Sequence, residues 1–342
     1  MNGIWTLIAA FISFAITALL GRKLIPFLHK IKYGQTILEI GPSWHKNKQG
    51  TPTMGGIMFI IGIVISSVVC IPLYYAVAGS QYLETPLMVT KIVAGLLMSI
   101  GFGLIGFLDD YIKVVKKCNL GLTSRQKLIL QFVVTAMYLA AIAVSQKLNG
   151  ATSLTSTIIP FVGRVDIGVL YWPIAAVLIA GIVNAVNLTD GIDGLNASVT
   201  FFVGICYMIV ASLLGMFGFS IMAAALAGGC LGFLIWNFNP AKVFMGDTGS
   251  LFLGGLVAAL AFGFDMPILI VPMGIVYICE MFSVILQVAY FKVTKGKRLF
   301  KMSPIHHHFE MSGWKEPKIC IVFSIVAIIG GLISIASVIF GV

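Results

Sequence analysis

The stretch Ile-Cys-Ile-Val-Phe-Ser-Ile-Val-Ala-Ile-Ile-Gly-Gly-Leu-Ile-Ser-Ile-Ala-Ser-Val-Ile-Phe, residues 319–340, contains no charged side chain. An apolar run of about 20 residues is long enough to cross the hydrocarbon core of a bilayer as a helix. Because that core has no water to satisfy backbone groups, a spanning segment must be a helix or part of a closed barrel. The run lacks the period-2 alternation of a strand, so it predicts a transmembrane helix.

Similar runs recur along the whole chain, which has 342 residues and is 59% hydrophobic and only 10% charged. A soluble domain of ordinary composition carries about 25% charged residues, so lipid is the main solvent of this protein. We therefore predict an all-α integral membrane protein, a single domain built as a bundle of about ten transmembrane helices. The approximate spans are 4–24, 54–73, 91–108, 128–146, 170–186, 197–214, 218–236, 249–264, 268–289 and 319–340.

The positive charges are segregated, because all but three of the 22 Lys and Arg residues fall on one side of these spans. The exceptions are Lys91, Lys147 and Arg164. The positive-inside rule makes the richer side cytoplasmic and places both chain termini on the other side. Confining a net charge of +10 to such loops is typical of contact with anionic lipid headgroups, not of a nucleic-acid surface. The predicted cytoplasmic segments are 25–53, 109–127, 187–196, 237–248 and 290–318.

Five of the 12 acidic residues stand beside the predicted cytoplasmic ends of apolar runs. They are Asp109, Asp110, Asp190, Asp193 and Asp247. A preference of charges for helix ends would explain one or two of them. However, an acid at the C-terminal end of a helix opposes the helix dipole, and Asp109 and Asp110 end the third span. Their position is unfavourable unless they bind a cation, so we interpret the five aspartates as functional.

Two polar segments, residues 184–196 and 236–250, carry three of these aspartates together with several Asn and Gly residues. Such residues are turn formers, and a simple turn is one interpretation. Many hard oxygen donors within a short segment also suit Mg²⁺, which takes few protein carboxylates and keeps water and phosphate oxygens. Asp247 stands just before a predicted helix, whose first backbone N–H groups could meet an anion. The sequence therefore predicts a magnesium-dependent, phosphate-handling site.

Three consecutive histidines lie in the segment Ser-Pro-Ile-His-His-His-Phe-Glu, residues 303–310. Adjacent histidines seldom point at one ion, and no Cys or second His pair accompanies them. We expect them to donate hydrogen bonds to phosphate, with Lys and Arg nearby; a solvated basic loop is the alternative. Glu280 lies within the ninth predicted span, and an intramembrane acid is by default a functional candidate. A buried hydrogen bond to Gln287, seven residues further on, is the other possibility.

In chain order, five cytoplasmic elements resemble the MraY family of phospho-MurNAc-pentapeptide transferases. They are residues 50–56 (Gly-Thr-Pro-Thr-Met-Gly-Gly), 109–113 (Asp-Asp-Tyr-Ile-Lys), 187–195 (Asn-Leu-Thr-Asp-Gly-Ile-Asp-Gly-Leu), 237–250 and 304–310. The aspartate motifs are shared with the wider superfamily of polyprenyl-phosphate N-acetylhexosamine-1-phosphate transferases. The Pro-Ile-His-His-His-Phe-Glu element is the part specific to the MraY family. With the ten spans, the resemblance covers nearly the whole chain.

The resemblance implies roles for particular residues. Mg²⁺ is the implied cofactor, with Asp247 and Asn187 as its ligands. The implied catalytic residues are Asp109, Asp110, Asp247 and His306. The implied substrate-binding positions are Lys48, Thr53, Lys113, Asn187, Asp190, Asp193, Asn237, Phe244, Gln287, His307 and His308. Among these, the ring of Phe244 is expected to stack on uracil.

The reaction that the resemblance implies takes place in the plasma membrane of a bacterium, at a site facing the cytoplasm. It transfers phospho-MurNAc-pentapeptide from UDP-MurNAc-pentapeptide to undecaprenyl phosphate, giving lipid I and UMP. The family also implies a homodimer surrounded by membrane lipid, with no nucleic acid as partner. A phosphate monoester is largely a dianion at pH 7, so it needs little help from a general base. We therefore favour direct displacement, with Asp109 taking any residual proton and Asp110 placing Lys113 or the metal, over a phospho-aspartate intermediate.

Two other functions are compatible with parts of the pattern. A UDP-GlcNAc:polyprenyl-phosphate GlcNAc-1-phosphate transferase would share the aspartate motifs. A membrane transporter would place ionisable groups near mid-membrane on broken helices with internal repeats. Here only Glu280 lies deep in a span and we find no repeat, so the transferase is the favoured interpretation.

Overall fold

The computed structural model describes residues 2–30, 48, 50–78, 85–115 and 121–342. Most of the predicted cytoplasmic segment 25–53 lies outside these residues, as do residues 116–120 of the segment 109–127. Ten of the described helices are long and apolar enough to cross a membrane, which confirms the predicted all-α membrane bundle. They are α1 (Asn2–Lys30), α2 (Gly56–Ala78), α3 (Pro86–Val115), α4 (Ser124–Leu148), α5 (Tyr171–Thr189), α6 (Leu195–Leu213), α7 (Phe217–Asn237), α8 (Gly246–Gly263), α10 (Ile275–Val293) and α12 (Glu316–Gly341).

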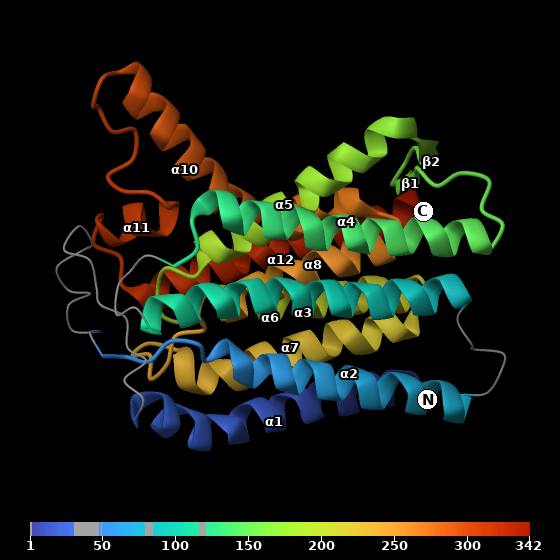
Figure 1. The fold of residues 1–342 in the computed structure, drawn as a ribbon, viewed down its shortest axis with the longest axis horizontal. Helices are drawn as coiled ribbons and strands as arrows, with labels where there is room; N and C mark the ends of the chain where they lie inside the picture. Colours follow the sequence, from blue (N-terminus) through green and yellow to red (C-terminus); the bar gives the residue numbers. More distant parts are fainter. Residues whose placement is uncertain (1, 31–47, 49, 79–84, 116–120) are drawn as a thin grey trace.

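Helix α8 lies at the centre of the bundle and packs against α3 and α5 (Figure 1). Of the residues in its apolar stretch, 94% are buried. Small residues on α8 permit this close packing. A Cβ atom at Gly254 would lie 2.7 Å from the Cα atom of Val183 on α5, so no larger residue fits there. Such small-residue contacts replace the hydrophobic effect as the basis of helix association in lipid. By contrast, only 22–28% of the residues in the apolar stretches of α1, α4 and α10 are buried, as expected for lipid-facing helices.

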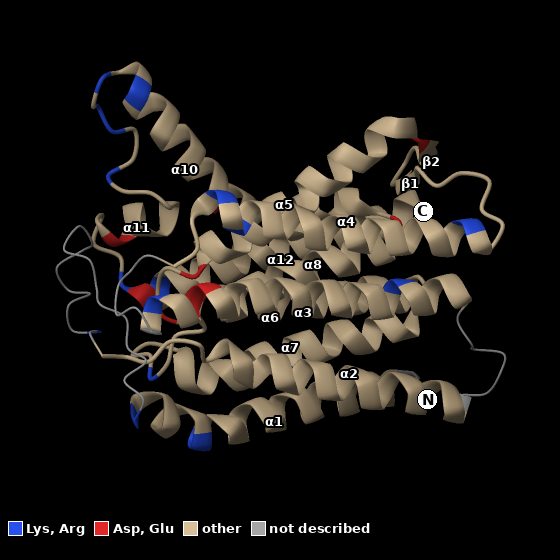
Figure 2. Cartoon of the chain, viewed as in Figure 1, with Lys and Arg blue, Asp and Glu red and all other residues tan. Residues whose placement is uncertain are grey.

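Charged residues gather at the end of the bundle that lies farthest from the two labelled termini (Figure 2). We call it the charged end; the C-terminal ends of α3, α5 and α7 and the N-terminal ends of α4, α6 and α8 form it. Consecutive helices alternate in direction, so an even number of crossings returns the C-terminus to the end at which the N-terminus lies (Figure 1). The aspartates of the predicted site all belong to the charged end.

The opposite end carries an antiparallel hairpin that the sequence did not predict, formed by β1 (Ser156–Ile159) and β2 (Gly163–Asp166). A 3₁₀ turn, Gly168–Leu170, follows and leads into α5. The hairpin is attached to the bundle because the backbone N–H of Ile158 donates to the carbonyl oxygen of Asp265 at 2.8 Å. Asp265 also forms an ion pair of 2.7 Å with Lys91, which is 1% exposed. This pair anchors the end of α8 to α3.

The ninth span differs from the single helix predicted over 268–289. A 3₁₀ turn, Pro267–Leu269, and a short helix α9, Ile270–Met273, precede α10. Proline lacks an N–H and disfavours continuation of a helix through it, which accounts for the interruption near Pro267 and Pro272. Beyond this interruption α10 leans away from the bundle (Figure 1), and the short helix α11 (Ile305–Glu310) lies against the first half of α10, at Glu280.

A substitution at the contact between α1 and α7 tests this packing. A Cβ atom at Gly228 would overlap the carbonyl oxygen of Ala10, whereas nothing lies within 4 Å of a Cβ atom at Gly181 on α5. We expect Gly228→Ala to lower the free energy of unfolding by about 1–3 kcal/mol, the usual cost of overpacking. Gly181→Ala should leave it unchanged or raise it, since alanine favours a helix. Thermal unfolding of the purified protein in detergent measures both, and equal melting temperatures would contradict the packing described.

Candidate active site

The site begins with the close contact of α3 and α8. A Cβ atom at Gly106 on α3 would overlap the carbonyl oxygen of Asp247, so glycine is required for the approach. The contact places the next turn of α3, which carries Asp109 and Asp110, beside the first turn of α8. Residues that are far apart in the sequence thereby share one site.

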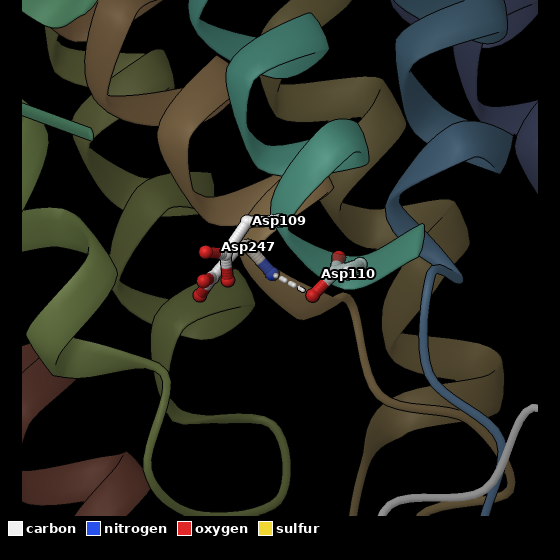
Figure 3. A group of neighbouring side chains, drawn as sticks. All are labelled: Asp109, Asp110 and Asp247. Carbon is white, nitrogen blue, oxygen red and sulfur yellow. Dashed lines mark hydrogen bonds between the residues drawn. The ribbon is translucent and has the colours of Figure 1, made fainter. Parts of the chain in front are cut away.

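Asp110 caps the N-terminus of α8 (Figure 3). Its carboxylate, 1% exposed, accepts hydrogen bonds from the backbone N–H of Asp247 at 3.3 Å and of Thr248 at 2.9 Å. The hydroxyl of Thr248 donates a third bond at 2.7 Å. The expectation that Asp110 opposes a helix dipole is therefore wrong, because α3 continues to Val115 and Asp110 faces the positive end of another helix. We expected the first N–H groups of α8 to meet a substrate anion, but two of them, those of Asp247 and Thr248, donate to Asp110.

Asp109 is held by two different contacts. Its Oδ2 atom lies 2.6 Å from the ammonium group of Lys113, one turn further along α3. Its Oδ1 atom accepts a hydrogen bond of 2.8 Å from the backbone N–H of Leu122. Asp109 thus fixes the segment that leads into α4. That helix starts with a capping box, in which Thr123 and Gln126 satisfy each other's backbone N–H groups.

Asp247 is the residue on which four helices converge. Its Oδ2 atom lies 2.8 Å from the ammonium group of Lys127 on α4 and 3.1 Å from that of Lys113 on α3. Its Oδ1 atom accepts a hydrogen bond of 2.8 Å from the amide of Asn187 on α5, which also donates to Ser250 at 2.7 Å. We did not predict Lys127 and Ser250 as site residues. Lys127 stood out only as one of several cations in the segment 109–127.

Three carboxylates in this part of the site could hold a metal ion. One oxygen atom from each of Asp109, Asp110 and Asp247 lies within 4.8 Å of the others (Figure 3). Such hard oxygen donors are those that Mg²⁺ and Ca²⁺ prefer. Asn187 lies beside Asp247, where a further ligand would be expected, although the nitrogen of its amide faces that carboxylate. The ligand roles stay predictions.

Asp190 follows the end of α5 and lies near this cluster. Enclosure by protein atoms, together with the negative charges of Asp247, Asp110 and Asp193, raises the pKa of Asp190 well above its ordinary value. The burial is the larger cause. Asp190 therefore keeps its proton to a higher pH than an exposed aspartate does, and its protonated carboxyl can donate a hydrogen bond.

A second group of predicted residues surrounds Asp193, which is 2% exposed. Its Oδ1 atom pairs with Lys48 at 2.7 Å, and its Oδ2 atom accepts hydrogen bonds from Asn239 at 3.2 Å and from the backbone N–H of Ala241 at 2.9 Å. Glu316, which we did not predict, binds Lys48 at 2.6 Å and accepts from the backbone N–H of Asp193 at 2.8 Å. These contacts join the loop after α5 to the loop after α7 and to the start of α12.

Two more predicted residues hold the same loops. Asn237 accepts a hydrogen bond of 3.1 Å from the backbone N–H of Gly194 and donates one of 2.9 Å to the carbonyl of Val243. The main chain of Phe244 pairs with the element 50–56, because its N–H donates to the carbonyl of Pro52 at 2.8 Å. The ring of Phe244 is partly exposed, as stacking on a base would require.

Thr53, in the same element, is 2% exposed. Among the described residues its hydroxyl has no hydrogen-bond partner. A Cβ atom at Gly246 would lie 2.7 Å from the Thr53 Oγ1 atom, so this hydroxyl lies against the start of α8. Thr53 is therefore near Asp110 and the carboxylate cluster.

The three histidines lie on α11 and point to different partners. His306 is completely buried, with its Nδ1 atom 3.1 Å from the Oε1 atom of Glu280. The Nδ1 atom of His307 lies 2.6 Å from the Oε2 atom of Glu310, and the Nδ1 atom of His308 accepts a bond of 3.2 Å from the backbone N–H of Lys301. Full burial of His306 excludes a merely solvated loop at that position. The phosphate-binding roles stay predictions.

The expected alternative of a hydrogen bond between Glu280 and Gln287 is wrong. Residues seven apart on a helix lie about 10 Å apart along its axis, and each of these two has a nearer partner. The Oε1 atom of Gln287 accepts from the backbone N–H groups of Leu299 at 3.0 Å and Phe300 at 2.9 Å. Its amide donates to the carbonyl of Phe300 at 3.1 Å. Gln287 thus holds the segment that leads to α11.

The structure therefore assembles the predicted residues in three adjoining groups. The carboxylate group contains Asp109, Asp110, Lys113, Asn187 and Asp247; the second contains Lys48, Asp193, Asn237 and Phe244; the third contains Gln287 and His306, His307 and His308. The third group meets the loop after α5, which follows Asn187 of the first group and carries Asp193 of the second, because a Cβ atom at Gly191 would overlap the Nε2 atom of His306.

Comparison with known proteins identifies the family of the chain. Residues 92–264, from α3 to α8, match the family described as Glycosyl transferase family 4, and residues 48–60 match phospho-N-acetylmuramoyl-pentapeptide-transferase signature 1. The fold and the site thus define a membrane-embedded transferase with its polar residues at one end of the bundle.

Curated relatives extend the match over nearly the whole chain. The chain is 46% identical to a protein of Clostridium perfringens (strain SM101) that is named phospho-N-acetylmuramoyl-pentapeptide-transferase. The alignment covers 96% of this chain and 95% of that relative. Proteins of the same name from Halalkalibacterium halodurans and Caldicellulosiruptor bescii are 44% and 42% identical to this chain, and each alignment covers at least 96% of both chains. The chain belongs to the phospho-N-acetylmuramoyl-pentapeptide-transferase family, which confirms the resemblance found in the sequence.

The cap of α8 can be tested at Thr248. Thr248→Val keeps the shape of the side chain but removes the hydroxyl that donates to Asp110. We expect the free energy of unfolding to fall by about 1.5–3 kcal/mol, as for other hydrogen bonds to charged groups. Thr248→Ser retains the donor and is the matched control. Circular dichroism during heating gives the melting temperature of both variants. Equal melting temperatures of the valine and serine variants would show that the bond is dispensable.

Proposed function

We propose that this chain transfers phospho-MurNAc-pentapeptide from UDP-MurNAc-pentapeptide to undecaprenyl phosphate, releasing UMP and forming lipid I. The observation that carries the proposal is the cluster of Asp109, Asp110 and Asp247 with Lys113 and Lys127 at the charged end of a membrane bundle. In a chain of this family, such a cluster suits a reaction between two phosphate-bearing substrates. One substrate is a lipid and the other a charged nucleotide, so the site has to lie at a membrane surface.

The distribution of Lys and Arg supports the location. The charged end holds most of the basic residues, and the positive-inside rule would direct it to the cytoplasm of a bacterium. The nucleotide is soluble and would reach the site from that side, whereas the acceptor lipid would reach it within the plasma membrane. We also propose a homodimer, because the family resemblance implies one.

Mg²⁺ is the proposed cofactor, and the residues fit it. Asp109, Asp110 and Asp247 offer carboxylate oxygens close to one another, and Asn187 could add an amide oxygen after rotation of its side chain. Bound there, Mg²⁺ would supply positive charge to the phosphates and to the UMP that leaves. The ammonium groups of Lys113 and Lys127 now pair with Asp247, so they would shift from this carboxylate toward the substrate phosphates when the ion binds.

The chain's own residues would act mainly through charge and position. Lys113 and Lys127 would attract the phosphates and reduce the repulsion between two anionic substrates. Because the lipid phosphate is largely a dianion at pH 7, Asp109 would take only a residual proton. Asp110 is engaged with the start of α8, so its role would be to place Asp247 and its neighbours.

The second group of residues would bind the nucleoside. The hydrogen bonds of Asp193 and Asn237 fix the loops on either side, and the partly exposed ring of Phe244 would stack on uracil. Lys48 pairs with Asp193 and would contact the diphosphate or the base. Asp190, in the loop after α5, would contact the substrate beside them. The histidines of α11 would contact the diphosphate or the sugar-peptide; the buried ring of His306 would do so after the loop at Gly191 moves away from it.

The substrate assignment is tested with the full-length protein in lipid nanodiscs, undecaprenyl phosphate and Mg²⁺. We expect release of UMP from UDP-MurNAc-pentapeptide and none above background from UDP-GlcNAc. A phosphate-labelled UDP-MurNAc-pentapeptide should leave no label on the protein when the lipid acceptor is omitted, since we propose direct displacement. Turnover with UDP-GlcNAc alone would refute the proposed substrate. Label retained by the protein would refute direct displacement but not the reaction.

The metal site is tested by binding of Mn²⁺, a hard cation related to Mg²⁺, observed by electron paramagnetic resonance. Asp247→Asn removes one carboxylate but keeps the side-chain volume, and we expect it to weaken Mn²⁺ binding by more than about tenfold. Asp166→Asn, at the far end of the bundle on β2, is the control and should bind as the unchanged protein does. Equal affinity of the two variants would place the metal elsewhere.

A further inference from the structure

Glu280 lies within the membrane-spanning part of α10 and has no role in the reaction proposed above. The side chains of Glu280 and His306 are both 0% exposed. A charged carboxylate without a partner is costly at such a position. The imidazole of His306, on α11, lies at ion-pair distance from this carboxylate. The two residues are therefore interdependent.

Both oxygen atoms of Glu280 face His306. The Oε1 atom lies 3.1 Å from the Nδ1 atom of the ring, at ion-pair distance but not in hydrogen-bond geometry. The Oε2 atom accepts a hydrogen bond of 3.4 Å from the backbone N–H of the same residue. One carboxylate thus restrains both the main chain and the ring of His306.

The opposite edge of the ring lies against the loop after α5. A Cβ atom at Gly191 would overlap the Nε2 atom of His306, so the ring fits only because residue 191 is glycine. Gly191 stands between Asp190 and Asp193 in a loop that also adjoins Asn187. In the described part of the chain, the Nε2 atom makes no hydrogen bond. The imidazole is therefore held between an intramembrane carboxylate and the polar loop of the proposed site.

We infer that Glu280 is a positioning residue, which holds the imidazole of His306 so that its Nε2 atom faces the loop 187–193. A carboxylate that lies at ion-pair distance from one ring nitrogen and accepts from the backbone N–H of the same residue restrains the orientation of the ring, and it leaves the other ring nitrogen toward the loop. Glu280 itself touches no substrate. The inference rests on the proposed function, in which His306 contacts a phosphate or the sugar-peptide.

Two variants change the contacts on opposite edges of the His306 ring, and each has a matched control. Glu280→Gln removes the charge and keeps a carbonyl acceptor, whereas Gly191→Ala adds a methyl group where the ring lies. The controls are Cys279→Ala, at the neighbouring exposed residue on α10, and Gly181→Ala, whose Cβ atom would have nothing within 4 Å. A third variant, Glu280→Met, removes both acceptor oxygens at similar volume.

Steady-state UMP release by the full-length protein in nanodiscs measures the functional effect. We expect Glu280→Gln and Gly191→Ala to lower kcat by about 10–100-fold, as for other residues that orient a functional histidine. In Glu280→Gln, KM for UDP-MurNAc-pentapeptide should stay within about twofold, because Glu280 lies on α10 and makes no contact with the described residues proposed to bind the nucleoside. A general loss of folding would instead lower the amount of active enzyme and the melting temperature. Wild-type kcat in both variants would overturn the inference.

Amide hydrogen exchange over residues 305–311 provides a measurement that does not depend on turnover. We expect faster exchange in Glu280→Met, since the backbone N–H of His306 loses its acceptor, and no change in Cys279→Ala. Unchanged exchange in Glu280→Met would overturn the inference. If the wild-type protein releases no UMP from UDP-MurNAc-pentapeptide, the proposed function fails, and the exchange measurement still decides whether Glu280 holds His306.

Discussion

The first turn of α8 needs hydrogen-bond acceptors, because its backbone N–H groups have no intrahelical partners. Since α8 is the most enclosed helix of the bundle, the acceptor has to come from the protein, and Asp110 provides it. The close approach at Gly106 makes this possible. Once the start of α8 is fixed, Asp247 is fixed with it, and Lys113, Lys127 and Asn187 converge on its carboxylate. The remaining geometry of the site depends on this cap.

The site carries an excess of negative charge. Asp109, Asp110 and Asp247 lie together, and two ammonium groups accompany them. The raised pKa of Asp190 reflects this environment, because the charges of Asp247, Asp110 and Asp193 add to the effect of its burial. A phosphate-bearing substrate would be repelled by such a cluster unless further positive charge were present. The arrangement of the carboxylates, as well as their chemistry, therefore supports the proposal that Mg²⁺ binds there.

The sequence predicted the helical spans well, because the lack of charge over a long apolar run is enough to identify each of them. Residues 319–340 lack charge and became α12, and the same reasoning located the other spans. It could not show that Asp110 caps a helix 137 residues further on, because a single sequence holds no information about such contacts. For the same reason Asp110 was interpreted from its own helix and Lys127 was missed. The pairing of Glu280 was also missed, since helix spacing suggests a shared face but not the partner from another element.

The three groups of site residues are not attached to the same part of the fold. The carboxylate group lies on α3, α4, α5 and α8, which form the packed centre of the bundle, whereas Glu280 and Gln287 attach the histidine element to α10. Because α10 leans away from the bundle, its side-chain contacts with α11 and the loop before it have to bring the histidines back (Figure 1). The packing of Phe309 against Phe323 of α12, with ring centroids 5.8 Å apart, completes the attachment. A transfer that needs both the carboxylates and the histidines would thus depend on how α10 is held in the membrane, and Glu280 is the intramembrane residue through which that dependence would act.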